Sequence, residues 1–214
     1  MIWRFYAELV PFIIITVVTV VFWLIERRKF PVIQFKQPLK NILIGVIVGC
    51  IWIVVPVVVL KIIGVLSFNG TNVVSSLWLW AFSCMINVIM QELLVRGYIY
   101  QLLKYNYTKI HSIIVTTVLF TVLHGGAFEE GIIPVLCVIT MSLFMSLVME
   151  YTESLIAPIL LHFAWNFIGA IIFNTIALAS DYPHIFNANF NGNKIITGSN
   201  CLIEGSVIVL EFSL

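Results

Sequence analysis

The sequence contains few charged residues, since Asp, Glu, Lys and Arg make up only 10% of its 214 positions. A soluble domain of this size needs more charge to cover its surface, and a disordered chain needs a more polar composition. Acidic and basic residues nearly balance, with a formal net charge of +1, so nucleic acid is not an expected partner. Because 61% of the residues are hydrophobic and the mean hydropathy is +1.10, we predict a membrane protein.

Cysteine is also scarce, and the four cysteines share no short repeated spacing. Three of them lie inside apolar runs and are interpreted as small packing residues, namely Cys50, Cys84 and Cys137. Cys201 lies in the C-terminal tail and is interpreted as a free thiol. Zinc fingers and paired thiols are therefore not expected. The zinc-protease signature His-Glu-x-x-His is absent as well.

Long apolar runs dominate what remains, and a membrane-spanning helix needs about 20 mostly apolar residues. Six segments predict an all-α, polytopic transmembrane bundle, over residues 9–25, 42–63, 77 to beyond 90, 110–123, 132–149 and 155–178. The first is not interpreted as a signal peptide, because charged residues follow it where small residues would mark a cleavage site. Residues 205–214 predict the opening of a seventh helix. This segment either lies partway into the membrane or is truncated from a longer form.

Lysine and arginine favour cytoplasmic loops. The loop at 27–40 is rich in both and is predicted to be cytoplasmic, which places the N-terminus outside. The connection that holds Lys104 and Lys109 agrees with this orientation, whereas the remaining loops and the tail carry little positive charge. The chain then divides into two helices with the basic loop (1–76), a central core (77–178) and an extracytoplasmic tail (179–214).

A few polar side chains occur within or at the ends of the apolar runs, where each is costly and therefore a functional candidate. They are Gln91, Glu92, Arg96, His124, His162 and Asn166. Glu92 and Arg96 are spaced to pair on one helix, and His162 and Asn166 project to the same helix face. Each also has an ordinary interpretation, such as an ion pair at a helix end or a hydrogen bond between helices.

Helix geometry places Glu92 and His124 at a similar depth. If the chain turns near residues 106–108, Glu92 lies about 15 residues before the turn and His124 about 17 after it. These spacings correspond to roughly 22 and 25 Å along the two helices. His162 lies only about nine residues after the next turn, so it reaches the same depth only if that turn is deeper or the helices tilt.

A carboxylate, two histidines and an amide in one dry pocket can hydrolyse a peptide bond. The carboxylate, helped by a histidine or a metal, takes a proton from water, while the other histidine and Asn166 donate hydrogen bonds to the oxyanion. Zinc is one option, since Glu92, His124 and His162 are ordinary ligand types. A metal-free mechanism is the other.

These residues form three motifs in the order Gln91-Glu92-x-x-x-Arg96, Phe120-x-x-x-His124 and His162-x-x-x-Asn166. The set resembles the CAAX-protease and bacteriocin-processing family of intramembrane proteases, also called the Abi family. That family carries Glu-Glu-x-x-x-Arg, Phe-x-x-x-His and His-x-x-x-Asn, and the resemblance covers about residues 77–170.

The resemblance implies a membrane-embedded endopeptidase, commonly labelled a metalloprotease, in a bacterial plasma membrane. Its partners would be the lipid bilayer and a peptide or membrane-protein substrate. Glu92, with Gln91 beside it, and His124 would activate water, while His162 and Asn166 would stabilise the oxyanion. Arg96 would orient the glutamate.

Gln91 departs from the family pattern, in which the first glutamate of the pair is usually assigned to water activation. An amide cannot accept a proton at neutral pH, and losing a general base typically costs about 10²- to 10⁴-fold in rate. Either Glu92 serves as the base through a local shift, or the chain is a silent member that acts as a membrane binding or bacteriocin-immunity protein. A small transporter is the third alternative, but it predicts a polar path across the membrane that the sequence lacks.

Overall fold

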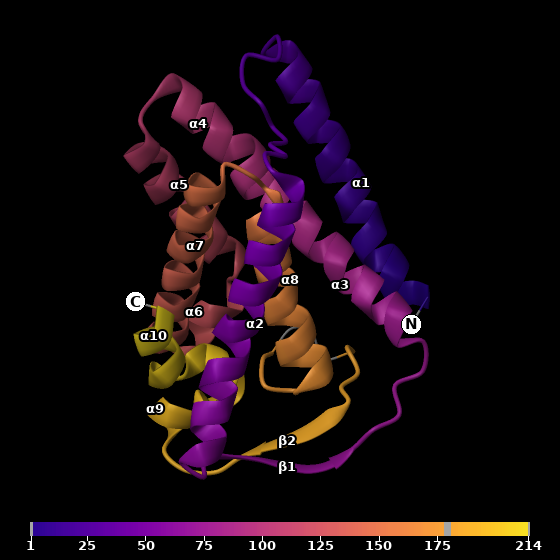
Figure 1. Cartoon of the computed structure of the whole chain (residues 1–214), viewed down its shortest axis with the longest axis vertical. Helices are drawn as coiled ribbons and strands as arrows, with labels where there is room; N and C mark the ends of the chain where they lie inside the picture. The colour runs from indigo at the N-terminus through magenta and orange to yellow at the C-terminus, as the bar shows by residue number, and fades with distance from the viewer. Residues whose placement is uncertain (1, 178–180, 214) are drawn as a thin grey trace.

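The computed structural model describes residues 2–177 and 181–213, which are mostly helical (Figure 1). The long elements are α1 (Ile2–Ile25), α2 (Pro38–Ile62), α3 (Leu77–Glu92), α5 (Lys109–Leu123), α7 (Ile132–Thr152) and α8 (Ile156–Asn166). A π-helix, η1 (Leu93–Ile99), joins α3 to α4 (Tyr100–Asn106), and a second, η2 (Phe167–Ile172), extends α8. The short elements are α6 (Gly126–Glu130), α9 (Lys194–Thr197), α10 (Val207–Ser213), the 3₁₀ turns η3 (Ser199–Cys201) and η4 (Ile203–Gly205), and strands β1 (Leu66–Thr71) and β2 (Phe186–Phe190).

Within these described residues, four helices are long and apolar enough to cross a membrane: Ile2–Ile25, Pro38–Ile62, Leu77–Asn106 and Ile132–Thr152. Two shorter apolar helices, Lys109–Leu123 and Ile156–Ile172, correspond to the fourth and sixth predicted segments. The predicted helical bundle is therefore confirmed. The chain is an integral membrane protein.

The sixth predicted segment is too long, because its helix ends at Ile172 rather than near Leu178. Asn174 adopts a left-handed backbone angle, φ 54°, which an α-helix cannot continue. The amide of Thr175 then caps the helix by donating to the Gly169 carbonyl oxygen at 2.7 Å. The predicted end at Leu178 itself, and the 178/179 boundary, lie outside the described residues.

At one end of the bundle, two features were not expected from the sequence and a third agrees with it. The loop between α5 and α7 contains the short helix α6. The loop between α2 and α3 pairs with the C-terminal tail as an antiparallel ribbon, with Leu66 of β1 opposite Phe190 of β2. The predicted seventh segment forms α10, and its last residue, Leu214, is outside the described part of the chain.

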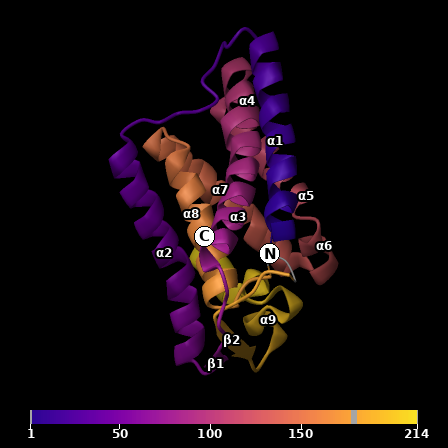
Figure 2. The ribbon, with the colours of Figure 1, turned by 90° about the vertical axis from the view of Figure 1, so that its right-hand side faces the viewer.

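The helices pack as pairs that fix the position of the site. Helix α2 runs along α8, and α1 runs along α3 (Figures 1 and 2). The α2–α8 contact is close because Gly45 and Gly49 face α8. A Cβ added at Gly45 would lie 2.7 Å from the Ala157 carbonyl oxygen, and one at Gly49 would lie 2.9 Å from the Leu161 Cα. Small residues that let helix backbones approach are typical of membrane interfaces.

Candidate active site

A buried ion pair and a histidine connect the first and third motifs. Glu92, the last residue of α3, is fully buried, and its Oε1 accepts a hydrogen bond from the Arg96 Nη1 at 3.1 Å. The same oxygen lies 2.9 Å from the Nδ1 of His162 in α8. Since a carboxylate only accepts, the His162 Nδ1 carries the hydrogen. The predicted Glu92–Arg96 pair is thus present, and the Glu92–His162 bond holds α3 against α8.

Arg96 extends this cluster to two further helices. Its Nη2 donates to the Ser142 hydroxyl at 2.8 Å and to the Ser142 carbonyl oxygen at 3.2 Å, both in α7. The guanidinium carbon also lies 4.4 Å from the ring centroid of Phe120 in α5, as in a cation–π contact. A buried charge needs such partners, because an unpaired one is strongly destabilising. Arg96 therefore links α3, α5 and α7 around the site.

His124 follows α5 directly and is held in one orientation. Its Nδ1 lies 2.8 Å from the Phe120 carbonyl oxygen, and its ring centroid lies 4.2 Å from that of Phe120. A carbonyl oxygen accepts but cannot donate, so the Nδ1 of the neutral ring carries the hydrogen and the Nε2 keeps a free lone pair. His124 can therefore accept a hydrogen bond or a proton at Nε2.

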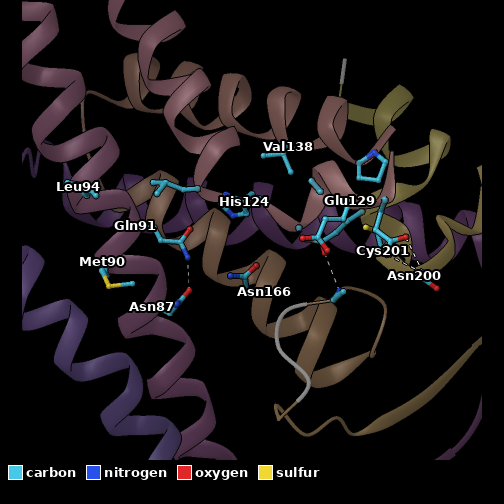
Figure 3. A pocket seen from close by; sticks show the side chains of 18 of the residues that line it. Asn87, Met90, Gln91, Leu94, His124, Glu129, Val138, Asn166, Asn200 and Cys201 are labelled. Atoms are coloured by element: carbon cyan, nitrogen blue, oxygen red, sulfur yellow. Dashed lines mark hydrogen bonds between the residues drawn. The ribbon is translucent and has the colours of Figure 1, made fainter. Parts of the chain in front are cut away.

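A cavity of about 680 Å³ lies beside this cluster and is lined by Gln91, His124 and Asn166 (Figure 3). The close-up shows these three side chains grouped together, although they come from α3, α8 and the end of α5. Glu92 and His162 are not among the described residues that line the cavity. The residues predicted from the sequence therefore form two sets. One set lines the cavity, and the other is buried beside it.

Gln91 belongs to a chain of hydrogen bonds with a fixed direction. The carboxylate of Glu8 in α1 accepts from the Asn87 Nδ2 at 2.7 Å, and the Asn87 Oδ1 accepts from the Gln91 Nε2 at 2.7 Å. Because Glu8 can only accept, Asn87 must present its amide nitrogen to Glu8 and its oxygen to residue 91. A donor is thus required at position 91, which glutamine provides and an ionised glutamate does not.

Two residues of the site were missed by the sequence analysis. Glu8 lies one residue before the predicted start of the first span, although its four-residue spacing from Arg4 would have indicated an ion pair, found at 2.6 Å. Ser142 carries no signal, because a serine within an apolar helix usually bonds its own backbone.

The residues proposed as zinc ligands are already bonded to other groups. Glu92 and His162 bond each other, the Nδ1 of His124 bonds the Phe120 backbone, and Arg96 places its positive charge against the carboxylate. Over the described ranges, no group of three or more His, Cys, Asp or Glu side chains is placed to hold a metal ion. This arrangement does not fit zinc, and the hydrolysis can be described with the side chains alone. Zinc dependence stays a prediction.

Comparison with known proteins agrees with the motifs. Residues 73–168 match the family model described as type II CAAX prenyl endopeptidase Rce1-like. The matched segment holds all three motifs, from Gln91 to Asn166. No curated protein and no solved structure matches the chain. The resemblance inferred from the motifs is confirmed over residues 73–168, which are similar to the Rce1-like type II CAAX prenyl endopeptidases.

Proposed function

We propose that the protein is an intramembrane endopeptidase that hydrolyses a peptide bond in a peptide or membrane-protein substrate, using water activated by His124. The family supplies the general activity, a protease embedded in the bilayer. The observation that carries the finer proposal is the shared cavity, where the free Nε2 of His124 faces the same space as the amides of Gln91 and Asn166.

In this mechanism water is held between the His124 Nε2 and the Gln91 Oε1, the oxygen that the Asn87 contact leaves free. His124 takes one proton as the water oxygen attacks the peptide carbonyl carbon. The carbonyl oxygen becomes an oxyanion, and the Asn166 side-chain amide donates a hydrogen bond to it. A water-poor cavity strengthens this contact because the local dielectric is low.

Glu92 has a positioning role in this proposal, in place of the role of base that the resemblance implies. Its Oε2 has no hydrogen-bond partner, but that oxygen is buried and Glu92 does not line the cavity. To take a proton from cavity water the side chain would have to move, and the move would pull its Oε1 away from Arg96 and His162. Breaking a buried ion pair typically costs about 3–5 kcal/mol. We therefore assign Glu92, Arg96 and His162 to holding α3 and α8 in register, so that Gln91 and Asn166 face each other across the cavity.

The orientation of the chain suggests the side from which the substrate enters. The cavity is lined by Arg4, residues of α6 and residues of the 198–204 tail, all in segments predicted to be extracytoplasmic. The basic loop at 27–40 lies at the other ends of α1 and α2. We therefore propose a bacterial plasma-membrane protein with its N-terminus outside, whose cavity receives substrate from the outer face.

The direct test is hydrolysis of quenched fluorescent peptides, with and without a farnesylated cysteine, by the purified full chain in lipid nanodiscs. Wild type is expected to cleave at least one peptide, and His124→Ala to lose about 10²- to 10⁴-fold in kcat. Asn166→Ala should lower kcat by about 10²- to 10³-fold, as expected for an oxyanion donor. Adding a chelator to the wild-type reaction tests zinc dependence, and unchanged activity would contradict it.

A binding protein without peptidase activity is the second candidate, and the Glu8–Asn87–Gln91 chain favours it. That chain is complementary to an amide at position 91, as expected if the site is adapted to hold a peptide rather than to remove a proton. This candidate predicts that wild type binds peptides in the panel without cleaving any of them. Cleavage that depends on His124 would exclude it.

A further inference from the structure

The cavity has a second acid–base group at its wall, outside the membrane helices. Glu204, in the 3₁₀ turn η4, lines the same cavity as His124 and Asn166. Its Oε1 accepts from the Trp165 indole Nε1 at 3.4 Å, and its Oε2 accepts from the Ala177 backbone amide at 3.2 Å. Trp165 immediately precedes Asn166 in α8, so this carboxyl group is anchored beside the proposed oxyanion donor.

The segment that carries Glu204 is held rigidly. Gly198 and Gly205 touch so closely that a Cβ at Gly205 would lie 2.5 Å from the Gly198 carbonyl oxygen, and Gly198 has φ 80°, which suits glycine. Between them, Ile203 is fully buried and its amide donates to the Thr175 carbonyl oxygen at 3.0 Å. The turn thus holds the Glu204 side chain against α8 rather than free in solvent.

Glu204 differs from the other carboxyl groups at the cavity. Glu129 and Glu130 are exposed, and Glu130 accepts hydrogen bonds from Asn200 at 3.1 Å. Glu204 is half-buried, and this burial raises its pKa to about 7, although the bonds from Trp165 and Ala177 lower it. It can therefore carry a proton at neutral pH, as a general acid must.

Peptide hydrolysis requires such a group, because an amine anion is a poor leaving group. His124 accounts for the proton taken from water, but the nitrogen must gain a proton as the C–N bond breaks. We propose that Glu204 donates this proton to the leaving amine nitrogen. The inference rests on the proposed function, and it adds a residue from the tail to the catalytic set.

The step is balanced within the cavity. The tetrahedral intermediate collapses, the C–N bond breaks, and the Glu204 carboxyl proton passes to the nitrogen, which leaves as an amine. His124, protonated by the attacking water, returns its proton to the Glu204 carboxylate through cavity water. The net change is one peptide bond and one water converted to a carboxylic acid and an amine, with both side chains restored.

Other titratable groups lie near Glu204 on the elements around the cavity, and a pH test must take them into account. They are Arg4 in α1, His124 after α5, Glu129 and Glu130 in α6, Cys137 in α7 and Cys201 in η3. Glu204 must be protonated to act as an acid, and it is protonated below its pKa. Wild-type kcat for a peptide should therefore fall as the pH rises through about 7.

The experiment compares two substrates with the same acyl part: the peptide cleaved fastest in the panel, and its 4-nitrophenyl ester. The ester needs no general acid, because 4-nitrophenolate leaves without a proton. Glu204→Gln should lower kcat for the peptide by about 10²-fold or more and remove the fall near pH 7, while ester hydrolysis stays at the wild-type rate. Glu129→Gln is the matched control and should leave both rates and the pH profile unchanged. His124→Ala should abolish ester hydrolysis, which locates that reaction in the cavity.

Three results would overturn the inference. Equal loss of peptide and ester hydrolysis in Glu204→Gln would indicate a structural role. An unchanged peptide rate would show that Glu204 is not used, and would leave the proposed function standing. If wild type hydrolyses neither substrate, the proposed function fails and the inference fails with it.

Discussion

At the scale of single residues, the direction of a hydrogen-bond chain explains the amide at position 91. A glutamate there would face the Asn87 Oδ1, an acceptor, and two acceptors repel each other. Asn87 cannot turn around, because its nitrogen is required by the Glu8 carboxylate. The acidic group on α1 and the amide on α3 are therefore complementary, and neither residue can be exchanged alone without cost.

A double-mutant cycle tests this complementarity. Gln91→Glu alone should lower the free energy of unfolding by about 1–3 kcal/mol, because a buried acceptor is left unsatisfied. Glu8→Gln with Gln91→Glu should recover most of that loss, since Asn87 can then turn and the whole chain can reverse direction. The measurement is thermal unfolding of the purified variants in one detergent. Additive losses in the double variant would contradict the idea of coupling between positions 8 and 91.

Part of the site could be predicted from the sequence. Helical spacing predicted the Glu92–Arg96 pair, and residue counts from the predicted turn placed Glu92 and His124 at comparable depth. The division of the polar residues between a cavity and a buried cluster could not be predicted. It depends on how each helix is rotated, and rotation is set by packing partners such as Ser142 and Phe120, which carry no local signal.

At the scale of elements, the α2–α8 contact determines where His162 and Asn166 lie. Both residues are on α8, and α8 is packed against α2 through Gly45 and Gly49. A larger residue at either glycine has no free space, because the nearest atoms belong to α8 and include its backbone. The glycines therefore act on the site from a distance, through the position of one helix.

Gly49→Val is expected to destabilise the fold by about 1–3 kcal/mol, the usual range for overpacking. It should also lower peptidase activity, because α8 must move away and carries Asn166 with it. Unfolding free energy and kcat, measured on the same preparation, provide the test. Ile47→Val is the matched control on α2, since Ile47 is 54% exposed and faces outward. Equal stability of the Gly49 variant and the control would show that the contact is not tight in solution.

The presence of each apolar helix was easier to predict than the residue at which it ends. Six apolar runs gave six helices, because burial in lipid requires both apolar side chains and internal hydrogen bonds. The end at Ile172 depends on the left-handed Asn174, and the β1–β2 ribbon joins segments that are far apart in sequence. Neither feature has a periodicity that a local pattern could reveal.

At the scale of the whole molecule, the basic loop and the cavity are at opposite ends. Basic residues gather in the loop between α1 and α2, where Lys36 pairs with Glu153 after α7. The cavity lies toward the other end, near the N-terminus and the tail. If the positive loop is cytoplasmic, the site must open on the outer side.

Cysteine labelling in intact cells tests this orientation. Val73→Cys, at a fully exposed position beside β1, should react with a membrane-impermeant maleimide, whereas Lys29→Cys should react only after lysis. Background from the native thiols should be low. Cys84 and Cys137 are buried, the half-buried Cys50 lies within the membrane-spanning helix α2, and burial raises the pKa of the Cys201 thiol to about 11. The reverse pattern would place the site in the cytoplasm.

The β1–β2 ribbon has a consequence for biogenesis. The first strand emerges from the ribosome long before its partner, because all the helices from α3 to α8 are made between them. The edge of β1 stays unpaired while those helices insert, and an unpaired strand edge can pair with other chains. Pairing can be completed only after α8 is in place. The ribbon therefore closes the outer surface as a late event, and any delay in inserting α8 prolongs the period in which a nascent chain is vulnerable to aggregation.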